Sequence, residues 1–333
     1  MTIKLSVLDQ SPISEGMCAR EALNNTVELA QFVEKLGFTR FWVSEHHDSP
    51  SLAGSSPEVL IAHLAQNTSK IRVGSGGVML PHYSSYKVAE NFRLLEGLNP
   101  DRIDLGLGRA PGGMPMASMA LSDGKHRDVH RYPEQIDELL GYLTDSLPPS
   151  HPYQGLTAAP MIPTMPEVWM LGSSPSSAML AAQKGLPYTF AQFINGEGGP
   201  QYTEAYRNHF VPSEFLDKPK NTVAVFTICA ETDEVAERVA SSIDLSLIMI
   251  EQGMRSNGTP SPEKAAGYQY SPFEAARVRE NRKRMIVGGP EKVKREILQL
   301  SEEYQTDEIM LVSITYDFKD KLKSFELIAD ALL

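Results

Sequence analysis

The chain has 333 residues, of which 41% are hydrophobic and 22% charged, and its 42 acidic side chains outnumber 31 basic ones to give a net charge of −11. This composition is typical of a globular protein, and the acidic excess argues against binding to nucleic acid or to an anionic membrane surface. No apolar run approaches the roughly 20 residues that span a bilayer, so we expect a cytoplasmic protein with no membrane segment. Cys18 and Cys229 are isolated and are predicted to be free thiols.

Short β-branched or aliphatic runs alternate with amphipathic stretches along almost the whole chain. The pattern predicts strands at residues 3–8, 40–44, 71–74 extending toward 78–80, 103–107, 168–171, 188–191, 222–230 and 308–313. It predicts helices at residues 22–35, 57–67, 86–95, 132–143, 176–184, 233–251, 272–284, 290–304 and 318–332. Eight strands that alternate with helices predict an α/β protein in which residues 1–333 form one TIM (β/α)8 barrel domain. A Rossmann-like sheet is the rival fold, but no glycine fingerprint follows the first strand.

Three polar or Gly/Pro-rich segments interrupt the alternation, at about residues 109–131, 147–166 and 253–271. They are predicted to be insertions, and the fold class is a barrel with insertions at its C-terminal face. The active sites of TIM barrels lie at that face. The residues that directly follow the predicted strands are therefore the candidates for chemistry.

The second strand runs into Glu45-His46-His47. Imidazole and carboxylate groups are common metal ligands, but adjacent residues on a strand point to opposite faces and cannot readily chelate one ion. We therefore predict no metal site. A histidine that lines a pocket would be suited to proton transfer near neutral pH, whereas a histidine in the core would be structural. Glu45 and Asp9 are expected to orient their neighbours.

The fifth strand runs into residues 172–177, which contain four serines at a strand-to-helix junction. Backbone N–H groups, hydroxyls and the positive end of the helix dipole make such a junction suitable for a phosphate. Plain capping of the helix by serine is the alternative. Arg109, in the glycine-rich loop after the fourth strand, would supply a guanidinium that binds phosphate through two hydrogen bonds.

Gly76 and Gly77 lie together inside a predicted strand. This pair indicates a bulge, a simple bend, or a backbone that a flat ligand approaches closely. The sequence contains no G-x-S-x-G, P-loop or H-E-x-x-H motif, which removes the commonest hydrolase and nucleotidase interpretations.

Taken together, these motifs resemble those of the bacterial luciferase-like flavin-dependent monooxygenase family, and especially of its single-subunit branch. The resemblance covers nearly the whole chain. Its most specific segments are residues 41–47 (FWVSEHH), 73–81 (VGSGGVMLP), 99–109 (NPDRIDLGLGR) and 172–188.

The resemblance implies a TIM barrel that binds FMN. It implies that the flavin phosphate is held by Arg109, Ser173, Ser174 and Ser177. It places a non-prolyl cis peptide under the flavin ring at Gly76–Gly77, and it matches His46 to a histidine that transfers a proton near the flavin. Gly108 stands where luciferase has its reactive cysteine, so light emission is not implied. Residues 109–131 and 253–271 would overhang the flavin as lids.

By this resemblance the protein would be a monooxygenase that receives reduced FMN from a separate NAD(P)H:flavin reductase and uses O2 to oxidise a small organic substrate. The absence of a nicotinamide motif is consistent with a partner reductase. Two alternatives remain open, namely an F420-dependent oxidoreductase and a non-catalytic flavin-binding protein. A homodimer is also implied. The sequence does not identify the substrate.

Overall fold

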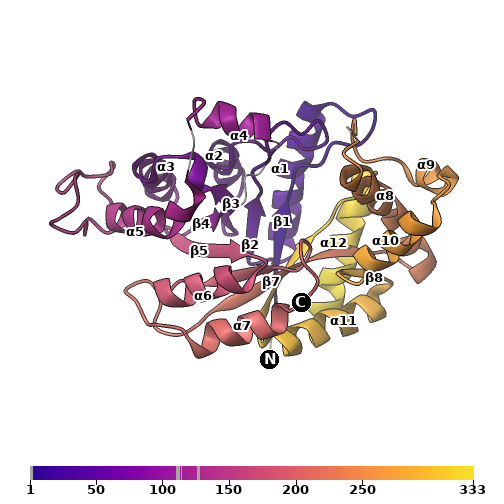
Figure 1. Ribbon diagram of the computed structural model, residues 1–333. Coiled ribbons are helices and arrows are strands. Elements are labelled where there is room, and N and C mark those ends of the chain that lie inside the picture. Colours follow the sequence, from indigo (N-terminus) through magenta and orange to yellow (C-terminus); the bar gives the residue numbers. More distant parts are fainter. Residues whose placement is uncertain (1–2, 110–112, 114, 126–127, 255) are drawn as a thin grey trace.

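The computed structural model describes residues 3–109, 113, 115–125, 128–254 and 256–333 (Figure 1). Its strands are β1 (Lys4–Asp9), β2 (Arg40–Val43), β3 (Arg72–Met79), β4 (Ile103–Gly108), β5 (Glu167–Gly172), β6 (Tyr188–Ala191), β7 (Asn221–Cys229), β8 (Met285–Gly288) and β9 (Glu308–Val312). Strands β1 to β7 pair in chain order and in parallel, β7 also pairs with β9, and β9 pairs with β1. These eight strands close into a parallel barrel, so the predicted TIM barrel is confirmed.

Helices surround the barrel (Figure 1). They are α1 (Ala19–Lys35), α2 (Pro57–Asn67), α3 (Ser85–Leu98), α4 (Pro115–Leu121), α5 (Tyr132–Leu143), α6 (Pro175–Lys184), α7 (Gly199–Asn208), α8 (Asp233–Glu251), α9 (Pro262–Gly267), α10 (Pro272–Arg282), α11 (Pro290–Tyr304) and α12 (Phe318–Leu332), with 3-10 turns η1 (Leu80–His82) and η2 (Val129–Arg131). Side chains along each strand point alternately outward, into an apolar layer between the strands and the helices, and inward, into the interior of the barrel. Along β1, Leu5 and Val7 pack in the outer layer and Leu8 packs in the inner one.

Helices α4 and α9 lie in segments that were predicted only as insertions, and two elements outside those insertions also differ from the sequence prediction. β8 was not predicted, and it pairs with the last four residues of β7, beyond the part of β7 that pairs with β6. Because Phe226 pairs with both Val312 of β9 and Met285 of β8, β8 must occupy the β6 edge of β7, above the end of β6. Helix α7 lies between β6 and β7, where no element was expected. The predicted eighth strand is β9.

The predicted insertions lie at both ends of the strands. Residues 109–131 follow β4 and include α4 and η2, although residues 110–112, 114 and 126–127 lie outside the described residues. Residues 253–271 follow α8, and Thr259 donates its backbone N–H to Ile13 beyond the end of β1. Residues 147–166 lead into the start of β5, and therefore lie at the opposite end of the strands.

Buried charges close the N-terminal end of the barrel. Arg40, at the start of β2, pairs with Asp104 of β4 at 2.7 Å and with Glu308 of β9 at 2.6 Å. Trp42 donates its indole N–H to Asp104 at 2.8 Å and packs edge-to-face against Trp169, with ring centroids 5.5 Å apart. Strands far apart in the sequence are thus joined by one polar cluster beneath the apolar interior.

Both cysteines are free thiols, with Cys18 exposed and Cys229 buried, as predicted. Within the described ranges, no helix combines the length and the apolar character that crossing a lipid bilayer requires. Across those same residues, no group of three or more His, Cys, Asp or Glu side chains is arranged to hold a metal ion.

Candidate functional site

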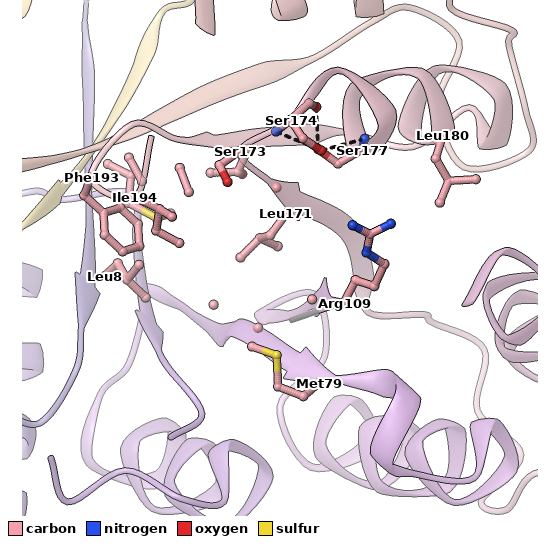
Figure 2. A pocket seen from close by; sticks show the side chains of 18 of the residues that line it. Leu8, Met79, Arg109, Leu171, Ser173, Ser174, Ser177, Leu180, Phe193 and Ile194 are labelled. Atoms are coloured by element: carbon pink, nitrogen blue, oxygen red, sulfur yellow. Dashed lines mark hydrogen bonds between the residues drawn. The ribbon is translucent and has the colours of Figure 1, made fainter. Parts of the chain in front are cut away.

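A cavity of about 250 Å³ opens at the C-terminal ends of the strands (Figure 2). It combines a polar end, at the turns after β4 and β5, with an apolar end over the centre of the barrel. Its lining includes Leu8, Gly76, Gly77, Met79, Arg109, Tyr132, Leu171, Ser173, Ser174, Ser176, Ser177, Leu180, Phe193, Ile194, Ala224 and Met310. The structure therefore brings together the candidates from β3, β4 and β5, and His46 is the one sequence candidate that is not part of this lining.

The polar end is built by the turn that begins α6 (Figure 2). Ser174 is the N-cap residue, and Arg109 extends toward this turn from the end of β4. Among the described residues, the guanidinium of Arg109 has no hydrogen-bond or ion-pair partner. The start of a ten-residue helix, two serine hydroxyls and an uncommitted cation make this end suitable for an anion.

The side chain of Ser177, like that of Ser174, takes part in the cap of helix α6. Its hydroxyl donates to the backbone oxygen of Ser174 at 2.8 Å and lies 3.1 Å from the hydroxyl of Tyr188. A Cβ atom at Gly172 would lie 2.1 Å from this hydroxyl, so only glycine fits there. The Ser177 hydroxyl is thus committed to the helix cap, which was the alternative reading of the serine cluster. The Ser174 hydroxyl belongs to the same cap, because it accepts the backbone N–H of Ser177 and lies 3.0 Å from the Ser176 hydroxyl, whereas Ser173 and Ser176 line the cavity without capping the helix.

Tyr132 adds a polar group that the sequence analysis missed. Its side chain is only 3% exposed and lines the cavity, yet its hydroxyl has no hydrogen-bond partner within the described part of the chain. Burial raises the pKa of Tyr132, and the nearby positive charge of Arg109 partly opposes that rise. A buried hydroxyl without a partner is costly, and it indicates that a polar ligand completes the site. No sequence signal marked this residue, because Tyr132 begins a regular amphipathic helix.

The apolar end lies over the middle of β3. The peptide bond between Gly76 and Gly77 is cis, as the resemblance implies, and the register with β4 shifts between Ser75 and Val78. A Cβ atom on Gly77 would lie 2.7 Å from the backbone oxygen of Gly106, so β3 and β4 approach too closely here for any larger residue. Leu8, Phe193 and Met310 complete an apolar surface that suits an aromatic ring system.

His46 lies beyond the end of β2. Its Nδ1 atom is 2.9 Å from the hydroxyl of Ser44, and its backbone N–H donates to Gly54. Burial, and to a smaller degree the neighbouring His47, lower the pKa of His46 to about 4. The imidazole is therefore neutral near pH 7, and Nε2 is the ring nitrogen left for proton exchange.

Asp9, at the end of β1, orients its neighbours as expected. Its carboxylate pairs with the buried Lys321 of α12 and accepts hydrogen bonds from Thr26 of α1 at 2.7 Å and from the backbone of Ser11 at 3.1 Å. These contacts tie the first and last helices to β1. Asp9 is therefore a structural residue of the barrel rim.

The residues present fit a phosphorylated flavin. Arg109, Tyr132 and the start of α6 would receive a phosphate, and the glycine pair with its apolar surroundings would accommodate a flat ring. Donors at one end and an apolar slot at the other match the two chemically distinct halves of FMN.

Comparisons with known proteins identify the family and several related chains. A model of the luciferase-like monooxygenase family matches residues 3–306. The chain is 57% identical over 329 residues to YwcH, an uncharacterized protein of Bacillus subtilis, with 99% of each chain covered. It is 40% identical over 336 residues to the N-acetyl-S-alkylcysteine monooxygenase of B. subtilis, with 99% of this chain and 98% of the relative covered. The solved structure of apo-MsnO8 matches 99% of each chain with a TM-score of 0.93 and 38% identity.

Two more distant structures share the fold. One is the oxygenating constituent of the 3,6-diketocamphane monooxygenase of Pseudomonas putida in complex with FMN, with a TM-score of 0.73 and 20% identity over 100% of this chain and 98% of that one. The other is an F420-dependent secondary alcohol dehydrogenase with an F420-acetone adduct, with a TM-score of 0.68 and 14% identity over 100% of each chain.

Proposed function

Because the chain belongs to the luciferase-like monooxygenase family, we propose that it is an FMN-dependent monooxygenase that uses reduced FMN and O2 to oxidise a small organic substrate. The observation that carries the proposal is the polar end of the cavity. There, the uncommitted guanidinium of Arg109 and the buried, unpartnered hydroxyl of Tyr132, at the start of α5, line the same cavity as the first turn of α6. The solved FMN complex of a protein with this fold supports the same cofactor.

The chemistry of such a reaction is carried by the cofactor. Reduced FMN, when bound, would supply two electrons to O2, so that one oxygen atom enters the substrate, the other leaves as water, and oxidised FMN remains. Arg109, Tyr132, Ser173, Ser174 and Ser176 would hold the phosphate. Gly76 and Gly77 would let the ring approach the backbone, while Leu8, Phe193 and Met310 exclude water. His46, neutral near pH 7, would take up or release a proton at Nε2.

FMN fits the polar end better than F420 does. FMN ends in a phosphate monoester with three free oxygens, which can accept from Arg109, Tyr132 and a serine hydroxyl together. The phosphate of F420 is a diester with one free oxygen fewer, so it could not accept from all of these donors in the same way. Because an F420-dependent secondary alcohol dehydrogenase shares this fold, the experiment below also tests for F420-dependent activity.

We propose that reduced FMN comes from a separate NAD(P)H:flavin reductase. The decisive experiment supplies the protein with FMN, NADH, such a reductase and 18O2, together with small thioethers that include N-acetyl-S-alkylcysteines, the substrates named for a relative. We expect one 18O atom in the product. No 18O in any product, together with as much hydrogen peroxide as the reductase and FMN produce alone, would favour a non-catalytic flavin-binding protein. Reduction of F420 by an alcohol would favour the F420-dependent alternative.

A pH effect on stability should come from His46. Its folded-state pKa of about 4 lies below the ordinary value of 6.5, so the folded protein binds fewer protons than the unfolded chain between these pH values. The stabilising contribution is complete above pH 6.5 and is lost as the pH falls toward 4, by at most about 1.4 kcal/mol per pH unit. Urea unfolding at pH 7.5 and pH 5 should show a smaller loss for His46→Gln than for the wild type. The exposed His209→Gln serves as control, and equal losses in all three proteins would contradict the assignment.

We also propose that the protein is a homodimer that associates through α2 and α3. Val59 on α2 and Leu94 and Leu98 on α3 are more than half exposed, at 68%, 54% and 68%. Light scattering should give twice the mass of one chain, and Val59→Glu combined with Leu98→Glu should reduce it to one. Phe273→Glu on α10, which replaces an apolar side chain that is 75% exposed, should leave the mass unchanged. A wild type with the mass of a single chain would exclude the dimer.

A further inference from the structure

A fully buried carboxylate sits between the ends of β2 and β3. The side chain of Glu45 has no exposed surface. One of its oxygens is 2.8 Å from Nε2 of His47 and 2.7 Å from the hydroxyl of Tyr83, and the other accepts the backbone N–H of Met79 at 2.9 Å. None of these three donors is used by the chemistry described above.

The backbone N–H of Met79 can only donate to Glu45, whereas the direction of the hydrogen bond between Glu45 and His47 depends on the tautomer of the imidazole. Burial, followed by the hydrogen bond and charge of Glu45, raises the pKa of Tyr83, and its hydroxyl therefore remains a donor. Hydrogen bonds to a charged group are about twice as strong as neutral ones. The hydrogen bond from Met79 to Glu45 therefore joins the end of β3 strongly to the segment that follows β2.

Met79 connects this carboxylate to the cavity. Its side chain lines the cavity, and a Cβ atom on Gly108 would lie 2.9 Å from its terminal methyl group. Met79 therefore packs on the end of β4, directly before Arg109. Gly76 and Gly77, the other β3 residues in the cavity wall, come three and two positions earlier in the same strand. One carboxylate after the end of β2 thus holds the end of β3, which in turn packs on the end of β4.

We propose that Glu45 is a positioning residue that holds Met79, and with it the end of β3, in place along the flavin cavity. Its effect on flavin binding rests on the proposed function, whereas its effect on β3 does not. Glu45 touches neither the cavity nor a reacting group, and it acts through Met79.

The test compares Glu45→Leu with Glu45→Gln. Leucine fills the space but accepts nothing, whereas the oxygen of glutamine can accept from Met79 while its NH2 group donates to Tyr83 and to the other tautomer of His47. We expect amide hydrogen exchange in residues 76–83 to be at least tenfold faster in Glu45→Leu and unchanged in Glu45→Gln. Tyr83→Phe removes one donor but keeps the Met79 contact, and it should also leave this exchange unchanged.

A second measurement uses oxidised FMN. Glu45→Leu should bind FMN at least tenfold more weakly and should change the visible circular dichroism of the bound flavin, and Glu45→Gln should restore both. Unchanged exchange in residues 76–83 of Glu45→Leu would overturn the proposal, as would faster exchange spread evenly over the whole chain. If Glu45→Leu does not fold, faster exchange in Glu45→Gln or Tyr83→Phe that is confined to residues 76–83 would contradict the assigned contacts. Exchange as expected in a wild type that binds neither oxidised FMN nor, under anaerobic conditions, reduced FMN would support the role of Glu45 and refute the proposed function.

Discussion

Replacing Arg40 by methionine is expected to lower the free energy of unfolding by about 3–5 kcal/mol. The Arg40 side chain is 3% exposed and pairs with Asp104 and Glu308, whose side chains are 0% and 3% exposed. Its guanidinium carbon also lies 4.7 Å from the centre of the Trp169 ring. Methionine would fill a similar volume but would leave carboxylates buried without their main counter-charge. An intact buried ion pair contributes little net stability. The expected loss therefore comes from the buried carboxylates that Arg40→Met leaves without a counter-charge.

Urea unfolding followed by tryptophan emission measures this loss directly, because Trp42 and Trp169 lie in the same cluster. Lys4→Met is the matched control. It breaks an ion pair with Asp307 at the same end of the barrel, but both side chains there are 52% exposed, so a change below about 1 kcal/mol is expected. A loss for Arg40→Met no larger than the loss for Lys4→Met would show that Arg72, 2.7 Å from Asp104, suffices to compensate the cluster.

The barrel was predictable because its signal is local, whereas this polar cluster was not. Each strand is a short apolar run followed by an amphipathic helix, and that alternation is visible in a single sequence. Arg40, Asp104 and Glu308 are separated by 64 and 204 residues, so no spacing rule relates them. They meet only because each lies at or near the start of its strand in a closed barrel.

Outside the predicted insertions, β8 and α7 were missed because each lacks a clear local pattern. β8 is a four-residue run, Met285–Gly288, that directly follows a predicted helix, and so short an apolar run has no period of its own. α7 begins with Gly-Pro and buries only Gly199, Thr203 and Tyr206, so it lacks the aliphatic stripe by which a helix is identified. Tertiary packing, rather than local pattern, decides both segments.

Much of the candidate site could be predicted because the barrel places every strand end at one face. This rule selected Arg109, the serines after β5 and the glycine pair of β3. It could not determine the direction of a hydroxyl, and Ser177 turns toward the helix cap. It also could not select Tyr132, which begins a helix after an insertion and reaches the cavity only through the path of the chain.

The polar end of the cavity leads to a sharp prediction on cofactor binding. Arg109→Ala should weaken the binding of oxidised FMN by tenfold to a hundredfold, because hydrogen bonds to charged groups contribute about 1.5–3 kcal/mol. Tyr132→Phe should weaken it by about twofold to tenfold, as expected for one neutral donor. Arg109→Lys keeps the charge but loses the planar pair of donors, so its affinity should lie between those of the wild type and Arg109→Ala. Quenching of tryptophan emission reports binding, since both tryptophans lie in the barrel beneath the cavity.

Riboflavin separates the phosphate from the ring, because it carries the same ring system without the phosphate. Its affinity should be the same for the wild type, Arg109→Ala and Tyr132→Phe, whereas a parallel loss for both ligands would place these residues at the ring or in folding. Arg131→Ala, at an exposed arginine near the same insertion, should change neither. A phosphate monoester gains its second proton near pH 6, so FMN affinity should fall below that pH for the wild type. The fall should be much smaller for Arg109→Ala. In the wild type the second negative charge of the phosphate strengthens binding because it attracts the guanidinium of Arg109, and the variant has no guanidinium there.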